Sequence, residues 1–296
     1  MLQLLLGGSG SGKTTLLYQR IRTRAEKGEK SILLVPEQFT SSTEGRIYRE
    51  LGDALSGMVE SFSFTSLAEK ILSTEGGAAV QTLSDAGRAV LVRRALEELQ
   101  DNVHYYHRHR RSAAFCQMAA QTIDELKSAG LSGRQLAQLA GACGAESGKL
   151  SELALIFQGY ETLLARSGMD PSDRLELAGA RLEEALARHS LPEFLRDRAV
   201  FIDEFDTFNA PKKRLLGAML AALPSVTVAL CDDGAPLLPG DLSLFSGAKQ
   251  VAAQLRQLAR KNGAEVAVPQ LLRKDLRHRN APGLAAVAEL LETGSC

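Results

Sequence analysis

Eight residues near the start of the chain have the types and spacing of a phosphate-binding loop. Residues 7–14 read Gly-Gly-Ser-Gly-Ser-Gly-Lys-Thr, which matches the pattern G-x-x-x-x-G-K-[ST]. Glycine reaches backbone angles that other residues resist, so successive N–H groups can point inward at a polyphosphate. The pattern predicts binding of ATP with Mg²⁺ by Gly7, Gly8, Ser9, Gly10, Ser11, Gly12, Lys13, Thr14 and Thr15. A plain glycine-rich turn is the alternative.

Two of these residues have specific expected roles. Lys13 is expected to contact the β- and γ-phosphates, and the Thr14 hydroxyl is expected to bind Mg²⁺. A pair of acidic residues far downstream supplies the second half of such a site, because an apolar run over residues 199–202 ends in Asp203 and Glu204.

Asp203 would hold Mg²⁺ directly or through water, and Glu204 would polarise an attacking water. We therefore assign Lys13 and Glu204 as catalytic, and Thr14 and Asp203 as metal-binding. Either carboxylate alone could be a surface residue, but an apolar strand that ends in two acids favours the site.

The elements that must position these residues predict an α/β fold. Residues 3–6 are a short apolar strand, and residues 15–21 are a helix whose N-terminus faces the phosphates. Continuous apolar runs indicate strands buried on both faces of a parallel sheet, with helices on both faces of that sheet. Further strands are expected over 31–35, 59–62, 226–231 and possibly 265–268, and helices over 44–55, 67–72 (with Ser66 as N-cap), 174–188, 211–223 and 251–261.

Helical periodicity replaces the strand pattern between residues 84 and 168. Helices are expected over 86–99, 113–128, 134–140 and 150–166, with a small-residue loop over 141–148. The predicted organisation is a first part of the sheet domain over 1–83, an all-helical insertion over 84–168, and a second part over 169–296.

Bulk composition restricts the class of protein. The 296 residues are 45% hydrophobic and 24% charged, and 35 basic residues balance 35 acidic ones, so any contact with nucleic acid must be local. No run approaches the roughly eighteen apolar residues of a membrane span, and no signal peptide is expected. The four cysteines, which have no C-x-x-C spacing, predict reduced thiols in a cytoplasmic protein: Cys116, Cys143, Cys231 and Cys296.

Single-stranded DNA needs stacking faces together with hydroxyl or amide donors for phosphates. Two stretches that follow predicted strands supply these types and are the candidate DNA-binding residues: Gln38, Phe39, Thr40, Ser61, Phe62, Ser63, Phe64 and Thr65. As the alternative, Phe62, Phe64 or both lie in the core.

Two other stretches have more ordinary explanations. Residues 131–135 mimic the signature of ABC-type ATPases, but Ser132 as a helix N-cap is the better account. Residues 104–111 combine histidines, arginines and two tyrosines that could hold DNA, or a metal through His104 and His107. A solvated turn between helices is favoured over both.

Several segments resemble, in order, the motifs of UvrD/RecB-type superfamily-one DNA helicases: residues 7–14, 36–40, 61–68, 169–175 and 201–209. Residues 34–40 together with the phosphate loop resemble more narrowly the N-terminal region of AddB, the B subunit of the AddAB helicase–nuclease.

The resemblance implies a RecA-like domain, ATP-driven motion on DNA, double-strand break repair and recombination, and Chi recognition. It implies single-stranded DNA and double-stranded DNA ends as substrates, and an AddA-type subunit as heterodimer partner. It also implies a nuclease domain with an iron–sulfur cluster, which these residues do not contain.

The chain departs from the family pattern at two places. No stretch upstream of Leu2 carries an adenine-reading glutamine, and Asp206-Thr207-Phe208 replaces the Gln-Asp-Thr that couples ATP to DNA. Roughly 65 residues follow Cys231, too few for a second RecA-like domain or a nuclease domain. We therefore expect binding of Mg·ATP with poor hydrolysis.

Phosphoryl transfer often uses an arginine at the γ-phosphate. The local substitutes for one from a second domain are Arg273, Arg277 and Arg279, which are expected to coat an exposed helix. Two further functions remain open: a nucleotide-binding module that scans DNA or holds a partner with little turnover, and a small-molecule kinase with the helical insertion as its lid.

Overall fold

A computed structural model describes residues 1–144 and 147–293. The chain forms two compact units. The first comprises Met1–Glu75, Ala180–Phe208 and Leu215–Cys296, and the second comprises Gly76–Gly179 and Asn209–Arg214. The domain boundaries expected near residues 84 and 168 remain predictions.

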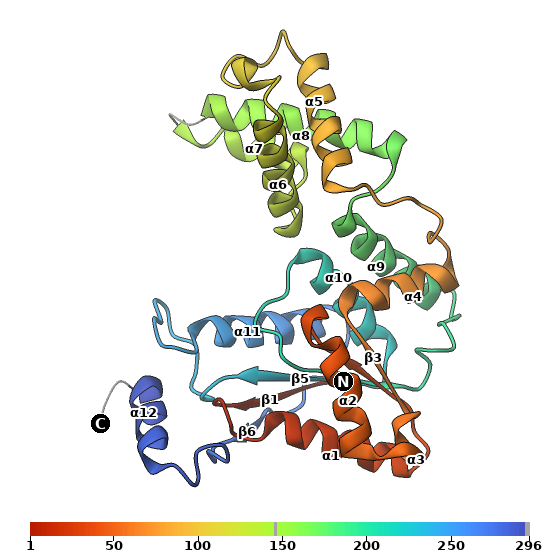
Figure 1. The fold of residues 1–296 in the computed structure, drawn as a ribbon, viewed down its shortest axis with the longest axis vertical. Helices are drawn as coiled ribbons and strands as arrows, with labels where there is room; N and C mark the ends of the chain where they lie inside the picture. Colours follow the sequence, from red (N-terminus) through yellow and green to blue (C-terminus); the bar gives the residue numbers. More distant parts are fainter. Residues whose placement is uncertain (145–146, 294–296) are drawn as a thin grey trace. The chain divides into compact units, whose positions relative to one another are not determined.

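Within the described residues, the first unit contains a six-stranded sheet whose paired strands are all parallel (Figure 1). The order across the sheet is β3-β2-β4-β5-β1-β6. The strands are β1 (Leu2–Gly7), β2 (Ser31–Leu34), β3 (Val59–Phe62), β4 (Ala199–Ile202), β5 (Ser225–Cys231) and β6 (Gln270–Leu272). The expected α/β class and parallel sheet are confirmed.

Both faces of the central strands are buried, which is why their sequences are apolar without alternation. One set of strand residues (Leu5, Leu33, Phe201 and Ala229) packs in a core with α1 (Lys13–Glu26) and α2 (Thr40–Leu51). In Figure 1, α1, α2 and α3 (Asp53–Ser56) lie on one side of the sheet, and α4 (Phe64–Glu75) and α11 (Ser246–Lys261) lie on the other.

Helices α2 and α11 begin four and five residues earlier than expected. A 3₁₀ turn, η1 (Glu37–Phe39), runs directly into α2, so that helix begins at Thr40 rather than at residue 44. The Thr40 hydroxyl donates to Glu37 O at 2.7 Å. Helix α11 begins at Ser246, five residues before the apolar pattern indicated.

The strand expected over residues 265–268 is displaced. Leu2 pairs with Val266 through an isolated bridge, and the regular strand β6 starts only at Gln270. Between these pairings the outer segment contains one residue more than β1, and Pro269 lies there. Proline has no N–H to donate to the ladder, so the regular pairing is interrupted at that point.

The expected N-cap of α4 is wrong. The helix begins at Phe64, and Ser63 precedes it; Ser63 Oγ accepts the Ser66 N–H at 3.1 Å, and Ser66 Oγ accepts the Ser63 N–H at 2.8 Å. This reciprocal pair satisfies two N–H groups at the helix start. Ser66 therefore lies within the first turn instead of capping it.

Described by itself, the second unit is helical around a core contributed by four helices: α5 (Asp85–Glu98), α6 (Ala113–Ser128), α7 (Gly133–Ala140) and α8 (Ser147–Ser167). Ser132 caps α7, as expected, and forms a capping box with Gln135. Helix α8 begins at Ser147 within the expected 141–148 loop, and Ala145 and Glu146 of that loop lie outside the described residues.

A buried carboxylate joins the start of α9 (Pro171–Ala187) to the second unit's other helices. Asp170 is 1% exposed and accepts the Tyr160 hydroxyl at 2.6 Å and the Lys127 ammonium at 2.7 Å. Lys127 also contacts Asp173 at 2.7 Å. Burial, together with this hydrogen bond to Asp170, raises the pKa of Tyr160.

No helix in the two described segments is both long and apolar enough to cross a membrane. Cys116 is buried and unpaired, and Cys143 and Cys231 are exposed and unpaired. Cys296 lies outside the described residues.

The capping pair of α4 gives a stability prediction. Ser63→Ala removes the acceptor of the Ser66 N–H, so we expect the free energy of unfolding to fall by about 0.5–2 kcal/mol in urea denaturation. Thr65→Ala, at an exposed position in the same turn, is the control. A loss no greater in Ser63→Ala than in Thr65→Ala would argue against the assigned cap.

Candidate functional site

The phosphate loop connects the end of β1 to the start of α1 through two left-handed glycines. Gly10 has φ +80°, and Gly12, the N-cap of α1, has φ +89°. A Cβ atom built on Gly10 would lie 2.6 Å from Arg277 Cβ, and one on Gly12 would lie 2.9 Å from Leu276 Cδ1. Both positions therefore need glycine for conformation and for space.

Lys13 is held over the loop rather than extended into solvent. Its ammonium donates to Gly7 O at 2.7 Å and to Gly8 O at 2.8 Å. The first turn of α1, including Thr14 and Thr15, leaves backbone N–H groups without acceptors inside the helix. The loop thus gathers one ammonium and several N–H donors, the groups that bind a phosphate.

Asp203 and Glu204 directly follow β4 and face this loop. The Asp203 N–H continues the ladder by donating to Leu34 O at 3.1 Å, and the Asp203 and Thr14 side chains line the same cavity. Asp203 is 6% exposed, and its Oδ1 accepts the Glu204 N–H at 3.0 Å. Asp203 is thus a buried residue on the cavity that also holds Thr14, the residue expected to share its metal.

Glu204 has φ +64°, a left-handed conformation that costs a non-glycine residue about 1–2 kcal/mol. Such strained residues concentrate at functional sites. Glu204 lies just after the end of β4, and its side chain lines the cavity. Its left-handed backbone conformation therefore supports a functional role.

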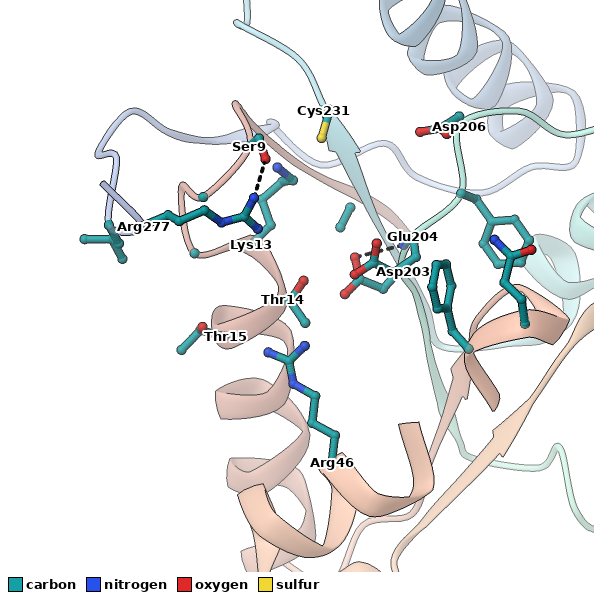
Figure 2. Close-up of a pocket in the computed structure, with 17 residues that line it drawn as sticks. Ser9, Lys13, Thr14, Thr15, Arg46, Asp203, Glu204, Asp206, Cys231 and Arg277 are labelled. Carbon is teal, nitrogen blue, oxygen red and sulfur yellow. Dashed lines mark hydrogen bonds between the residues drawn. The ribbon is translucent and has the colours of Figure 1, made fainter. Parts of the chain in front are cut away.

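Sheet topology explains why residues so distant in sequence meet. In the sheet β5 separates β1 from β4, and the carboxyl ends of parallel strands lie at one edge, where α/β folds bind ligands. There, a cavity of about 620 Å³ is lined by both motifs (Figure 2). Its walls include Ser9, Gly10, Gly12, Lys13, Thr14, Thr15, Asp203, Glu204 and Cys231.

Burial shapes the electrostatics of the two carboxylates. It raises the pKa of Asp203, while hydrogen bonds from Thr14 and Glu204 and the nearby Lys13 and Arg46 charges oppose the rise. It also raises the pKa of Glu204, and the Asp203 carboxylate raises it further. The site therefore holds two carboxyls whose ionised forms are costly, as expected where a cation or a proton acceptor is needed.

Arg46 was not among the residues expected from the sequence. This residue of α2 lines the cavity and points toward the space between the loop and the carboxylates (Figure 2). Its guanidinium lies 4.9 Å from the centre of the Tyr18 ring, and Tyr18 is 5% exposed. Burial is the main reason that the pKa of Tyr18 rises to about 12. In the sequence, the one sign of this contact between Arg46 and a ring was Tyr18, which lies one turn after Thr14 in α1.

Residues 275–277, which we call the covering segment, lie against the phosphate loop. The Leu276 N–H donates to Gly10 O at 3.0 Å, and the Arg277 guanidinium donates to Ser9 Oγ at 3.0 Å. Asp275 Oδ1 accepts the Arg277 N–H at 3.0 Å and closes the turn.

The expectation that Arg273, Arg277 and Arg279 coat an exposed helix is wrong. Residues 273–281 are turns and irregular chain, and α12 (Pro282–Thr293) begins after them. The physical reason is that Asp275 ties the local N–H groups into a turn, as short acidic side chains do. Arg277 instead reaches the cavity.

The predicted DNA-binding residues have different surroundings. Gln38 and Phe39 line the cavity, and Phe39 is 37% exposed. Phe64 is 2% exposed and packs edge-on against Phe205 and Phe208, with ring centres 5.2 Å and 6.0 Å away, so for this ring the core alternative holds.

The remaining candidates lie on or after β3, or at the start of α2. Phe62 is half-buried beside Phe194, and Ser63 is occupied as the cap of α4. Ser61 is half-buried, whereas Thr65 and Thr40 are at exposed or partly exposed positions. Their roles in DNA binding remain predictions.

The oxygen groups present suit Mg²⁺. Thr14 and Asp203 line the same cavity, and hard cations bind hydroxyl and carboxylate oxygens of this kind. Glu204 lies beside them on the cavity wall. In residues 1–144 and 147–293, no group of three or more His, Cys, Asp or Glu side chains is arranged to hold a metal by itself, so phosphate oxygens and water would complete the coordination.

Comparison with known proteins gives consistent matches over most of the chain. The family described as "ADDB, N-terminal" matches residues 4–288. The B subunit of the ATP-dependent helicase/deoxyribonuclease of Desulforudis audaxviator (strain MP104C) is 34% identical over 296 residues, covering 96% of this chain and 25% of that protein.

The B subunits of the same enzyme from two other bacteria are similar. The Moorella thermoacetica (strain ATCC 39073 / JCM 9320) protein is 32% identical, covering 96% of this chain and 25% of its own length. The Symbiobacterium thermophilum (strain DSM 24528 / JCM 14929 / IAM 14863 / T) protein is 31% identical, covering 98% and 26%. The chain thus spans about a quarter of the length of these relatives.

The raised pKa of Asp203 predicts a stability difference that depends on pH. A carboxyl with a higher pKa in the folded chain binds more protons there, so its contribution to stability falls as pH rises from about the unfolded value of 3.9. Asp203→Asn removes this cost and keeps an oxygen acceptor. We expect it to unfold at higher urea concentration than the wild type at neutral pH, with the gap closing toward pH 4.

Asp206→Asn, an exposed carboxylate on the same cavity, is the matched control. An Asp203→Asn variant that is less stable than the wild type at neutral pH would mean that the ionised carboxylate contributes net stability.

Proposed function

The chain belongs to the family of AddB N-terminal regions, and from this premise we propose that it is the nucleotide-binding, helicase-like part of an ATP-dependent helicase–deoxyribonuclease subunit. The proposed domain is RecA-like, which the parallel sheet and the phosphate loop after β1 support. The whole protein would act on DNA ends in double-strand break repair and recombination, with an AddA-type partner in the cytoplasm.

One observation carries the proposal. The phosphate loop and the acidic end of β4, more than half the chain apart, line the same cavity. Lys13 and Thr14 come from one wall, and Asp203 and Glu204 come from the other. This pairing of phosphate donors with two carboxylates supports binding and hydrolysis of a nucleoside triphosphate with its metal.

The residues would divide the reaction as follows. Lys13 exchanges the carbonyl oxygens of Gly7 and Gly8 for the β- and γ-phosphates, while α1 directs its first N–H groups at them. Thr14 and Asp203 would hold Mg²⁺, which would supply positive charge to the phosphates. Ionised Glu204 accepts a proton from the attacking water.

Two arginines are placed to stabilise charge that develops on the γ-phosphate. Arg277 approaches the loop from the covering segment, and Arg46 approaches from α2 (Figure 2). An arginine supplied by the same chain can accelerate phosphoryl transfer. Within this proposal, Arg277 takes the role that was expected of an arginine from a neighbouring domain.

Single-stranded DNA is the proposed substrate beside the nucleotide. Gln38 and Phe39 support this because they line the cavity at the end of β2, with part of the Phe39 ring exposed. A change at the γ-phosphate could therefore be passed to a DNA base through η1 and α2.

A second candidate, a nucleotide-binding scanning or scaffold module with little turnover, has one observation in its favour. Lys13 is already satisfied by two carbonyl oxygens, and the covering segment bonds to Gly10 and Ser9. A nucleotide must compete with these contacts. In this alternative, the function of the module would be to bind the nucleotide without hydrolysing it. Turnover stimulated by single-stranded DNA distinguishes the hydrolase from this module. The kinase alternative gains no support from the relatives.

Lys13 should contribute directly to the affinity for the nucleotide. Lys13→Ala removes a charge-assisted contact worth about 1.5–3 kcal/mol, so the dissociation constant for Mg·ATP should rise about 10- to 150-fold. Titration with a fluorescent ATP analogue measures it. Lys27→Ala, at the exposed C-cap of α1, should bind as the wild type does. Equal affinity in both variants would discard the phosphate-loop assignment.

Glu204 should separate binding from chemistry. Glu204→Gln keeps the size of the side chain but removes the proton acceptor, so we expect unchanged Mg·ATP affinity and turnover about 10²- to 10⁴-fold lower. Asp206→Asn tests whether any carboxylate at this cavity has the same effect, and should leave turnover near the wild-type value. If Glu204→Gln hydrolyses ATP at the wild-type rate, the scaffold function is favoured.

A further inference from the structure

The second unit contains a cavity unrelated to the nucleotide site. It has a volume of about 440 Å³ and is lined by aromatic, apolar and basic side chains of one loop and two helices: Tyr105, Tyr106, His109, Phe115, Met118 and Lys149. Tyr105 and Met118 remain 59% and 58% exposed. The loop, residues 104–111, already stood out in the sequence, but the proposed function gives it no role.

A buried carboxylate fixes this loop. Glu152 of α8 is 6% exposed, and its two oxygens accept the N–H groups of three successive residues: His104 at 2.7 Å, Tyr105 at 2.9 and 3.0 Å, and Tyr106 at 3.3 Å. Three converging backbone donors on one carboxylate hold the loop in one conformation. The segment is therefore an organised turn, whose aromatic rings are held before any ligand arrives.

The rings are arranged as a stacking surface. Phe115 stacks with Tyr106 and with His109, with ring centres 5.4 Å and 5.5 Å apart and an interplanar angle of 30° in both pairs. Tyr105 rests against the start of α8, because a Cβ atom on Gly148 would lie 2.8 Å from Tyr105 Cε2. The glycine thus lets the ring lie on the backbone while most of the side chain remains exposed.

The loop that carries most of these rings also contains arginines, including Arg108 and Arg111. Arginines of neighbouring α5 pair with carboxylates, as Arg93 does with Glu97 and Arg94 with Glu98. Within the described residues, Arg108 and Arg111 form no such ion pair, and both are exposed or partly exposed. Cations next to available aromatic faces are the combination that binds the phosphates and bases of a single strand.

We propose that this cavity is a binding site for single-stranded DNA, in which a base stacks on Tyr105 and the adjoining phosphates contact Arg108 and Arg111. It is separate from the DNA residues expected near β2 and β3, and it would hold the strand on the helical unit while the nucleotide site acts elsewhere. Choosing DNA as the polyanion rests on the proposed function. An apolar protein segment fits the observations less well, because it would leave the arginines uncompensated.

The test is fluorescence anisotropy of a labelled oligothymidylate with the 296-residue chain. Tyr105→Ala should weaken binding about 5- to 150-fold, the range for losing one stacked base. Tyr105→Phe should restore wild-type affinity, because it keeps the ring. Tyr48→Ala, a tyrosine of α2 that is also 59% exposed, should bind as the wild type does. Gly148→Ala, which displaces the Tyr105 ring without removing it, should also weaken binding.

Two further measurements examine the base and the phosphates separately. The wild type should bind an abasic oligonucleotide of the same length more weakly than it binds oligothymidylate. Tyr105→Ala should bind the two oligonucleotides with equal affinity. Replacing Arg108 and Arg111 together by glutamine should lower the slope of log affinity against log salt by about 1.4, since each single-strand phosphate contact contributes about 0.7. The pair Arg93→Gln and Arg94→Gln should leave this slope unchanged.

The outcomes separate this inference from the proposed function when Mg·ATP affinity is measured in the same variants. Normal Mg·ATP binding with oligothymidylate affinity unaffected by Tyr105→Ala would overturn the site. The same is true if Tyr105→Ala weakens only the binding of a partner protein. Loss of oligothymidylate binding in Tyr105→Ala, in a chain that never binds Mg·ATP, would support the site and contradict the nucleotide function instead.

Discussion

The parallel pairing of β1, β5 and β4 is the constraint on which the candidate site depends. It brings Gly7 and Asp203 to the same edge of the sheet, although the loop that follows one strand and the acids that follow the other are far apart in the chain. Asp203 then becomes buried at the cavity that Thr14 also lines. Burying a carboxylate is costly unless hydrogen bonds or cations compensate it, and here Thr14, the Glu204 N–H, Lys13 and Arg46 do so in part.

Several hydrogen-bond donors at this edge of the sheet already have acceptors within the chain. Lys13 bonds to the loop's own carbonyl oxygens, and the covering segment donates to Gly10 and Ser9. A polyphosphate would offer stronger charge-assisted contacts to the same donors. Nucleotide binding therefore becomes an exchange of partners, and the covering segment, which carries Arg277, is the element whose position that exchange would change most.

Much of this could be read from the sequence because each signal was local. The glycine-rich pattern indicated the phosphate loop, apolar runs indicated four of the strands, and Ser132 indicated the cap of α7. The other expectations failed where the structure depends on contacts that local sequence patterns do not encode. Pro269 moved the last strand, Asp275 turned the chain where a helix was expected, and Phe64 was drawn into the core by Phe205 and Phe208. Arg46 was missed because its position depends on a tertiary contact with the Tyr18 ring of α1.

The central claim is that the cavity between the phosphate loop and the end of β4 receives the triphosphate of Mg·ATP. A crystal structure of the chain with a non-hydrolysable ATP analogue and Mg²⁺ tests it most directly. The account predicts the γ-phosphate beside Lys13, the metal between Thr14 and Asp203, and the Lys13 ammonium released from Gly7 O and Gly8 O. An analogue bound elsewhere, with Lys13 still on those two oxygens, would contradict it.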